Sequence, residues 1–257
     1  MSVSRIGSAT HGIQSFGSST LSVTAPTGAV AGTDLILAFG FDGDTRTYPT
    51  TPPAGFTEIF GTRVGGDFEV DFDTGYMQAW WAVHNGDAAY TFTNIGNDAN
   101  IVAMAAYRGV YLAEPIGSYV YSGDIASPGI NVPSAGTISV PSLTPAFLGG
   151  AWVGVYGLFQ ATFGSSSPQT VTWTSPGGST KIKETNQDHR SACMIAELLD
   201  VSAATGAMST DWTTSYETKN TGGLGVLLNS AVAGTLTDRP DKQFRYPYTW
   251  DQVMRAS

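Results

Sequence analysis

The segment from residue 75 to residue 110 constrains the fold most, because it contains three short apolar runs in succession. The runs at 76–83, 89–94 and 101–108 are separated by Asn-Gly-Asp and Gly-Asn-Asp, which are turn-forming sequences. Within the first run the residues alternate with a period of two, as they do in a strand that buries two different faces. The third run is apolar on both faces, which predicts a central strand covered on each side. One face of the first run holds Met77, Ala79, Trp81 and Val83, and the other holds Tyr76, Gln78, Trp80 and His84.

The order of short apolar segments in residues 20–110 recurs in residues 138–230. Turn residues separate these segments at intervals of roughly 8–15 residues, which is typical of a sandwich or a jelly roll. We therefore predict an all-β fold, a β-sandwich or jelly roll built from two sequence-similar halves whose sheets pack face to face, with residues 111–137 as the crossover. A body over residues 1–236 is expected, and two tandem domains are the alternative. The matched positions are Gly32 with Gly149, Gly40 with Gly157, residues 91–93 with 211–213, and Ile101 with Leu224.

The composition excludes several classes of protein. Charged residues make up 13% of the chain, and a single cysteine, Cys193, rules out a disulfide within it. A net charge of −9 argues against sequence-independent nucleic-acid binding, which needs clustered Lys and Arg. The N-terminus lacks the pattern of a signal peptide, and the longest apolar runs are too short to span a bilayer. We expect a protein made soluble in a cytoplasm, with neither nucleic acid nor membrane as a partner.

Residues 237–257 have no counterpart in the first half and are predicted to form an extended C-terminal arm. Aromatic residues recur at every second position from 244 to 250, and two prolines favour extended backbone. Four cations against two carboxylates give residues 239–257 a charge of +2, while the other 238 residues carry −11. Such an arm suits an acidic surface, on its own body, on a neighbouring copy or on another protein. The predicted partner-binding residues are Arg239, Lys242, Phe244, Arg245, Tyr246, Tyr248, Trp250 and Arg255.

A second candidate surface is the alternating segment 66–74, which places four carboxylates on one face of a strand. Like charges on one face repel each other, so the face needs water, a cation or a basic partner. Together with the Asp-Gly-Asp sequence at 42–44, it could bind Ca²⁺ through oxygen ligands; no other cofactor is expected. The residues of this acidic face are Asp67, Glu69, Asp71 and Asp73.

The search for catalytic residues finds no nucleophile elbow, phosphate-binding loop, zinc motif or paired cysteines. His11, His84 and His189 are far apart in sequence and are interpreted as solvated. Glu69-Val70-Asp71-Phe72-Asp73 resembles the Glu-x-Asp-x-Glu strand of laminarinase-type and lichenase-type jelly-roll glycosidases, with Asp73 in place of the family's acid. This resemblance covers five residues only, so we predict no enzyme, no catalytic residue and no resident metal. The six tryptophans allow a sugar-stacking platform, but most lie within apolar strand patterns and are predicted to be core residues.

The sequence of the first half resembles a β-sandwich family of virion structural proteins from tailed bacteriophages, which is also found in prophage-derived bacterial proteins. The resemblance spans about residues 20–230 and implies a non-enzymatic, assembled role, with no catalytic residue carried over. Asp34 and the Arg108-Gly109 pair match the pattern and are interpreted as turn and strand-end residues. The motifs are Val-Thr-Ala-Pro-x-Gly at 23–28, Ala-Gly-Thr-Asp-Leu-Ile-Leu-Ala at 31–38, Pro-Pro-Ala-Gly-Phe-Thr at 52–57, Ala-Trp-Trp-Ala-Val with Tyr-Thr-Phe-Thr within 79–93, and Ala-Ala-Tyr-Arg-Gly-Val at 105–110.

From the resemblance and the arm together, the predicted function is that of a virion structural protein. The preferred hypothesis is a head decoration or cement protein that docks on the major capsid protein through its arm. A tail-fibre or receptor-binding protein that attaches to a tail protein or binds carbohydrate is the alternative, and a glycoside hydrolase is a third. The expected location is the virion, and the expected partners are other virion proteins and further copies of the chain.

Overall fold

A computed structural model of the chain describes residues 2–14, 19–42, 50–64, 75–94, 100–125, 135–160, 171–187, 191–214 and 218–231. These residues form an all-β structure, which confirms the predicted fold class. None of the described segments forms a helix long and apolar enough to cross a bilayer. The strands are β1 (Ser4–Gln14), β2 (Thr20–Thr24), β3 (Leu35–Asp42), β4 (Thr57–Val64), β5 (Gly75–Val83), β6 (Ala89–Thr93), β7 (Asn100–Arg108), β8 (Ile116–Ile125), β9 (Ala135–Val140), β10 (Gly150–Gln160), β11 (Val171–Trp173), β12 (Thr180–Gln187), β13 (Ser191–Val201), β14 (Met208–Thr214) and β15 (Thr218–Leu228).

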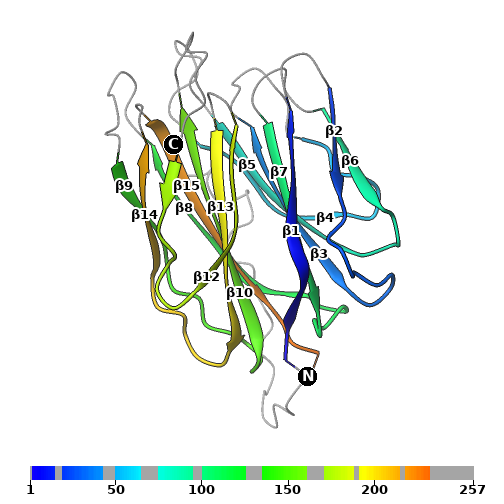
Figure 1. Ribbon diagram of the computed structural model, residues 1–257. Coiled ribbons are helices and arrows are strands. Elements are labelled where there is room, and N and C mark those ends of the chain that lie inside the picture. The colour runs from blue at the N-terminus through cyan, green and yellow to red at the C-terminus, as the bar shows by residue number, and fades with distance from the viewer. Residues whose placement is uncertain are drawn as a thin grey trace, which may run out of the picture.

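Each half of the chain forms one five-stranded antiparallel sheet and one small outer sheet (Figure 1). The large sheets have the orders β1-β7-β3-β5-β4 and β8-β15-β10-β13-β12, and the small sheets are β2-β6 and β9-β14-β11. When the five strands of each large sheet are numbered in chain order, both sheets have the order first, fifth, second, fourth, third. The strand order therefore repeats, and the repeat includes β1 and β8, which lie outside the boundaries predicted from sequence. The segment 111–137 is not only a crossover, because β8 lies within it.

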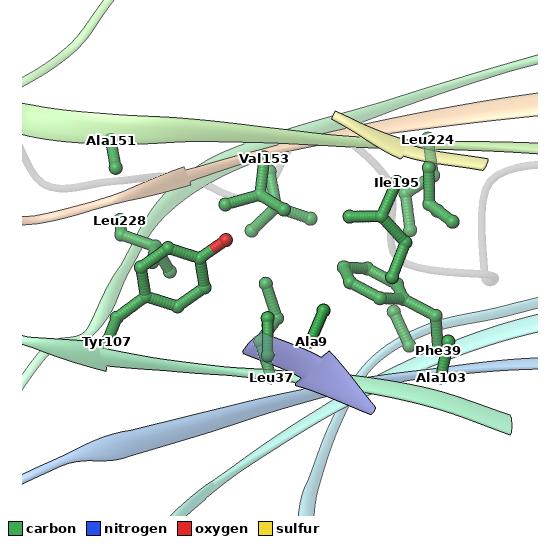
Figure 2. Close-up of a cluster of buried hydrophobic side chains, with 14 of the residues drawn as sticks. Ala9, Leu37, Phe39, Ala103, Tyr107, Ala151, Val153, Ile195, Leu224 and Leu228 are labelled. Carbon is green, nitrogen blue, oxygen red and sulfur yellow. The ribbon is translucent and has the colours of Figure 1, made fainter. Parts of the chain in front are cut away.

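The two large sheets pack face to face, and the core between them combines side chains from both halves. Strand β1 lies beside β12 and β4 lies beside β8, so the open edges of the two sheets adjoin. Figure 2 shows the close packing of side chains from the two sheets, with the Tyr107 hydroxyl directed from β7 toward the opposite sheet. Near β4 and β8, Phe60 stacks on Tyr121 with ring centroids 4.8 Å apart and covers that side of the core. The labelled core residues are Ala9, Leu37, Phe39, Ala103, Tyr107, Ala151, Val153, Ile195, Leu224 and Leu228.

The outer sheets bury the opposite faces of the large sheets in two further cores. Over the first half, Val23 and Phe92 pack on Trp80. Over the second half, Trp173 and Trp212 belong to one cluster with the buried Trp152. Burial of both faces explains why β7 is apolar at every position, as predicted for a central strand.

The positions of the tryptophans confirm that most of them are core residues. Trp80, Trp152, Trp173 and Trp212 are buried, and Trp81 is partly buried against the central core. In β5 the predicted alternation is also confirmed, because Met77 and Ala79 face the central core while Trp80 faces the outer one.

One of the sequence matches between the halves is wrong. Gly40 faces the outer core, where a Cβ would lie 2.7 Å from the Trp80 ring, whereas Gly157 faces the central core, where a Cβ would lie 2.6 Å from the Phe41 ring. Because side chains alternate along a strand, a match that is one residue out of register places the pair on opposite faces. The other glycine match is consistent with the structure, since Gly32 and Gly149 both have positive φ angles before the central strands, 71° and 74°.

Candidate functional site

The two site predictions made from sequence fall outside the described residues. The C-terminal arm at 237–257, with all eight of its predicted partner-binding residues, is one of them. The acidic face formed by Asp67, Glu69, Asp71 and Asp73 is the other, and the side chains of 42–44 are likewise not described. The described part of the chain therefore offers other candidates: three polar networks and one exposed apolar surface.

The first network surrounds Glu197 on β13, which is only 5% exposed at the edge of the central core. Its carboxylate accepts a 3.1 Å hydrogen bond from the Tyr107 hydroxyl and lies 3.6 Å from the guanidinium of Arg5 on β1. Burial raises the pKa of Glu197, opposed by the charge of Arg5 and the hydrogen bond from Tyr107. Burial likewise holds the pKa of Tyr107 well above its usual value, and the neighbouring carboxylate adds to this effect. The network joins strands of both large sheets across the interface between the halves.

The second network pairs Asp34, before β3, with Arg108 at the end of β7. The Asp34 carboxylate is fully buried and accepts hydrogen bonds of 2.8 and 2.7 Å from the Arg108 guanidinium. It also accepts a 2.7 Å bond from the backbone N–H of Val30, which fixes the turn that leads into β3. Burial alone would raise the pKa of Asp34, but the bonds from Arg108 and Val30 lower it overall. These two residues were interpreted from sequence as separate turn and strand-end devices, and the structure shows that they act as one pair.

The third network involves His84, which is 6% exposed, so its interpretation as a solvated histidine is wrong. Its Nδ1 lies 2.7 Å from the Tyr90 hydroxyl, which in turn donates a 3.2 Å bond to the side-chain carbonyl of Asn85. The Asn85 side chain also accepts a bond from the backbone N–H of Asp87 and so closes the turn between β5 and β6. His11 differs from the prediction too, since it lies within β1, where burial and the charge of Lys183 lower its pKa. His189 lies outside the described residues.

These networks engage the buried charged and imidazole groups in contacts with other parts of the protein. Within the described ranges, no three His, Cys, Asp or Glu side chains group together in a way that could hold a metal ion. Cys193 is fully buried in the central core, and burial raises the pKa of its thiol to about 12, so it stays a protonated core residue at neutral pH.

An apolar surface lies at the end of the molecule where β15 stops, and we call it the apolar end. It consists of Tyr111, Phe147 and Leu148, of which Leu148 is 66% and Tyr111 43% exposed. The rings of Tyr111 and Phe147 lie 6.4 Å apart. Monomeric proteins often expose single apolar side chains, but neighbouring ones indicate a contact surface.

Hydrogen bonds to the end of β15 hold the two loops of the apolar end in place. The backbone N–H of Tyr111 donates to the carbonyl of Asn229, and the Ser230 hydroxyl donates to the carbonyl of Leu148. The side chain of Asn229 donates a 2.8 Å bond to the carbonyl of Glu114. Because these bonds fix both loops to one strand, the apolar end is a preformed surface.

Sequence reasoning missed Glu197 and the apolar end, although each left a local signal. Glu197 is a lone carboxylate that interrupts the apolar run 192–199, and Leu148 stands directly before two glycines in a loop. Neither signal identifies a contact partner, because those partners are distant in sequence. No family model, curated protein or solved structure matches this chain.

Proposed function

We propose that this protein is a non-enzymatic structural component of a bacteriophage virion, a head decoration or cement protein that docks on neighbouring virion proteins through its C-terminal arm. The observation that carries the proposal is the use of the buried charged groups as structural contacts. Asp34, His84 and Glu197 each bond to another residue and tie loops or strands together. A molecule built in this way is suited to presenting fixed surfaces.

The arrangement of the sheets supports the same proposal. Two large sheets share one core, and each is covered on its other face by a small sheet, which gives four packed layers. The motifs that carry the resemblance to phage virion proteins fall mainly in β2, β3, β5, β6 and β7 and in their turns. Their residues build the first half of the body, as expected of structural motifs.

The arm supplies the docking step in this proposal. Its aromatic residues at 244, 246, 248 and 250 would provide apolar anchors, and its cations would set the register on an acidic partner. A truncated chain that ends at residue 237 should keep the β-sheet circular dichroism of the full chain but fail to enter particles. A matched variant with Arg239, Lys242, Arg245 and Arg255 changed to Gln keeps the aromatic anchors. We expect it to enter particles less well than the wild-type chain. Its incorporation should also depend less on salt, because the charge attraction that salt screens has been removed.

Copy number in purified particles tests the location. Quantitative gels of virions should give hundreds of copies for a head protein and a few to dozens for a tail protein. Normal incorporation of the truncated chain, or particles that lack this polypeptide altogether, would refute the proposal.

A receptor-binding role in the tail is the second candidate, and Tyr119 favours it. This residue on the edge strand β8 is 48% exposed, and its ring lies 6.2 Å from Phe60, so an aromatic face is open at the junction of β4 and β8. Such a face can stack on a sugar ring. Binding of the isolated protein to host cells or glycans, lost in Tyr119→Ser, would favour this role over cementing.

A further inference from the structure

The apolar end is suited to an occupant that is both apolar and basic. Tyr111 and Leu148 are exposed and Phe147 is partly exposed, and two exposed carboxylates lie close to them. Glu114, whose backbone N–H bonds to the carbonyl of Tyr111, is exposed. Asp200 is also exposed and lies beside Gly149, where its Oδ1 is 3.5 Å from the position that a Cβ would take. An apolar surface flanked by carboxylates is complementary to aromatic residues interspersed with Arg and Lys.

The chain supplies such a segment directly after this surface. Ala231, the last described residue, donates its backbone N–H to the carbonyl of Gly109, two residues before Tyr111. Asn229 lies two residues before Ala231, and its backbone carbonyl accepts a hydrogen bond from the N–H of Tyr111. The described part of the chain therefore ends at the apolar end, and the sequence that follows carries the alternating aromatics and the four cations of 239–257.

Chain length favours occupancy by the same molecule over occupancy by a second copy. Residues 232–243 separate Ala231 from Phe244, and twelve residues span at most about 40 Å, so Phe244 has ample chain to return to a surface beside Ala231. A tether of this length gives an effective concentration on the order of millimolar, well above the concentration of a second copy in dilute solution.

From these observations we infer that, in the free protein, residues 244–250 bind to the apolar end of their own chain, with Tyr111, Phe147 and Leu148 receiving the aromatic side chains. Glu114 and Asp200 face the neighbouring cations. The inference does not depend on the virion role, because it concerns the protein before any assembly. It adds that a partner of the arm must compete with the chain's own apolar end.

Cysteine pairing in the full-length protein tests this contact. Ala113 is exposed beside Tyr111, so Ala113→Cys leaves the three apolar side chains intact, and Thr249→Cys leaves the aromatics of the arm intact. The native Cys193 is fully buried and will not compete. With oxidised glutathione, the double variant should form an intramolecular disulfide, seen as a faster-migrating monomer on a non-reducing gel. The comparison protein carries Ser22→Cys, on the exposed face of β2, together with Thr249→Cys. It should form the disulfide at least about tenfold more slowly.

A pair of further substitutions separates a specific contact from random collision. Adding Leu148→Asp to the reactive double variant should reduce the rate to that of the Ser22→Cys protein. Adding Ile13→Asp, at another apolar position that is 41% exposed near the other end of β1, should leave the rate unchanged. Unfolding midpoints of all variants check that each remains folded. Equal rates at positions 113 and 22, or a product that is mainly a disulfide-linked dimer, would overturn the inference whether or not the protein enters virions.

Discussion

The hydroxyl of Tyr107 on β7 donates a hydrogen bond of 3.1 Å to the carboxylate of Glu197 on β13, a residue 90 positions later in the chain. The two strands belong to different large sheets, so this bond crosses the interface between the halves. Both side chains are buried, and loss of one partner leaves the other without its bond in an environment of low polarity.

We expect Tyr107→Phe to destabilise the protein by about 1–3 kcal/mol, the usual cost of leaving a buried polar group unsatisfied. The ring is retained, so little packing is lost. The measurement is the free energy of unfolding in urea at neutral pH, with the dependence on urea concentration unchanged. Tyr119→Phe removes a hydroxyl from a half-exposed ring and provides the control, for which we expect almost no change. Equal stability of the two variants would mean that the Tyr107 bond adds nothing to the interface.

The pH dependence of stability should reveal the buried carboxyl of Glu197. Its pKa is raised by burial, so the folded state holds this proton at a pH where the unfolded state, with a glutamate pKa of about 4.3, has released it. The stabilisation is complete below the unfolded pKa and is lost as the pH rises through the folded one. Relative to wild type, Glu197→Gln should therefore gain stability as the pH rises from the unfolded pKa of about 4.3 through the raised pKa of Glu197 in the folded state.

Unfolding measured at several pH values across that window checks this expectation. Glu184→Gln, a substitution of the same type at an exposed position on β12, provides the baseline to subtract. After this subtraction, the difference in free energy of unfolding between Glu197→Gln and wild type should grow in favour of the variant as the pH rises. A difference that stays constant or shrinks would contradict a raised pKa for Glu197.

The pair of Asp34 and Arg108 should have the opposite pH dependence. The pKa of Asp34 is lowered overall, so its stabilisation is present above the unfolded aspartate pKa of about 3.9 and is lost as the pH falls through the lower folded value. Asp34→Asn should cost roughly 1–3 kcal/mol at neutral pH, because charged hydrogen bonds to Arg108 and Val30 are weakened. The gap between variant and wild type should narrow below about pH 4. Asp87→Asn, which alters an exposed carboxylate in the turn after β5, is the control.

The sequence predicted the elements whose pattern is local. The predicted strands at 76–83, 89–94 and 101–108 agree with β5, β6 and β7 to within one residue at each end, because alternation and turn sequences mark both boundaries. The burial of Trp80 and Trp212 followed in the same way from apolar strand patterns.

What the sequence did not predict depends on contacts between distant residues. Strand β8 lies in a segment rich in Gly and Ser, and it is a strand because it pairs with β15, about a hundred residues later. The bond from Tyr107 to Glu197 and the pair of Asp34 with Arg108 need the same knowledge of which strands adjoin. The mismatch of Gly40 with Gly157 shows how one residue of register, which sequence similarity between the halves cannot fix, moves a side chain to the opposite core.

The close contact between the outer sheet and β15 leads to a last prediction, at Gly223. A Cβ at this position would lie 2.8 Å from Val140 and 2.9 Å from Ile138, both on β9, so β9 can pack here only because the residue has no side chain. Gly223→Ala should therefore force the two strands apart and cost about 1–3 kcal/mol, as overpacking does in other cores. Gly177→Ala is the matched control, because nothing lies within 4 Å of its Cβ position, and it should leave the unfolding midpoint nearly unchanged or raise it slightly. If urea unfolding instead shows Gly223→Ala to be as stable as Gly177→Ala, then β9 does not pack against β15 as closely as described.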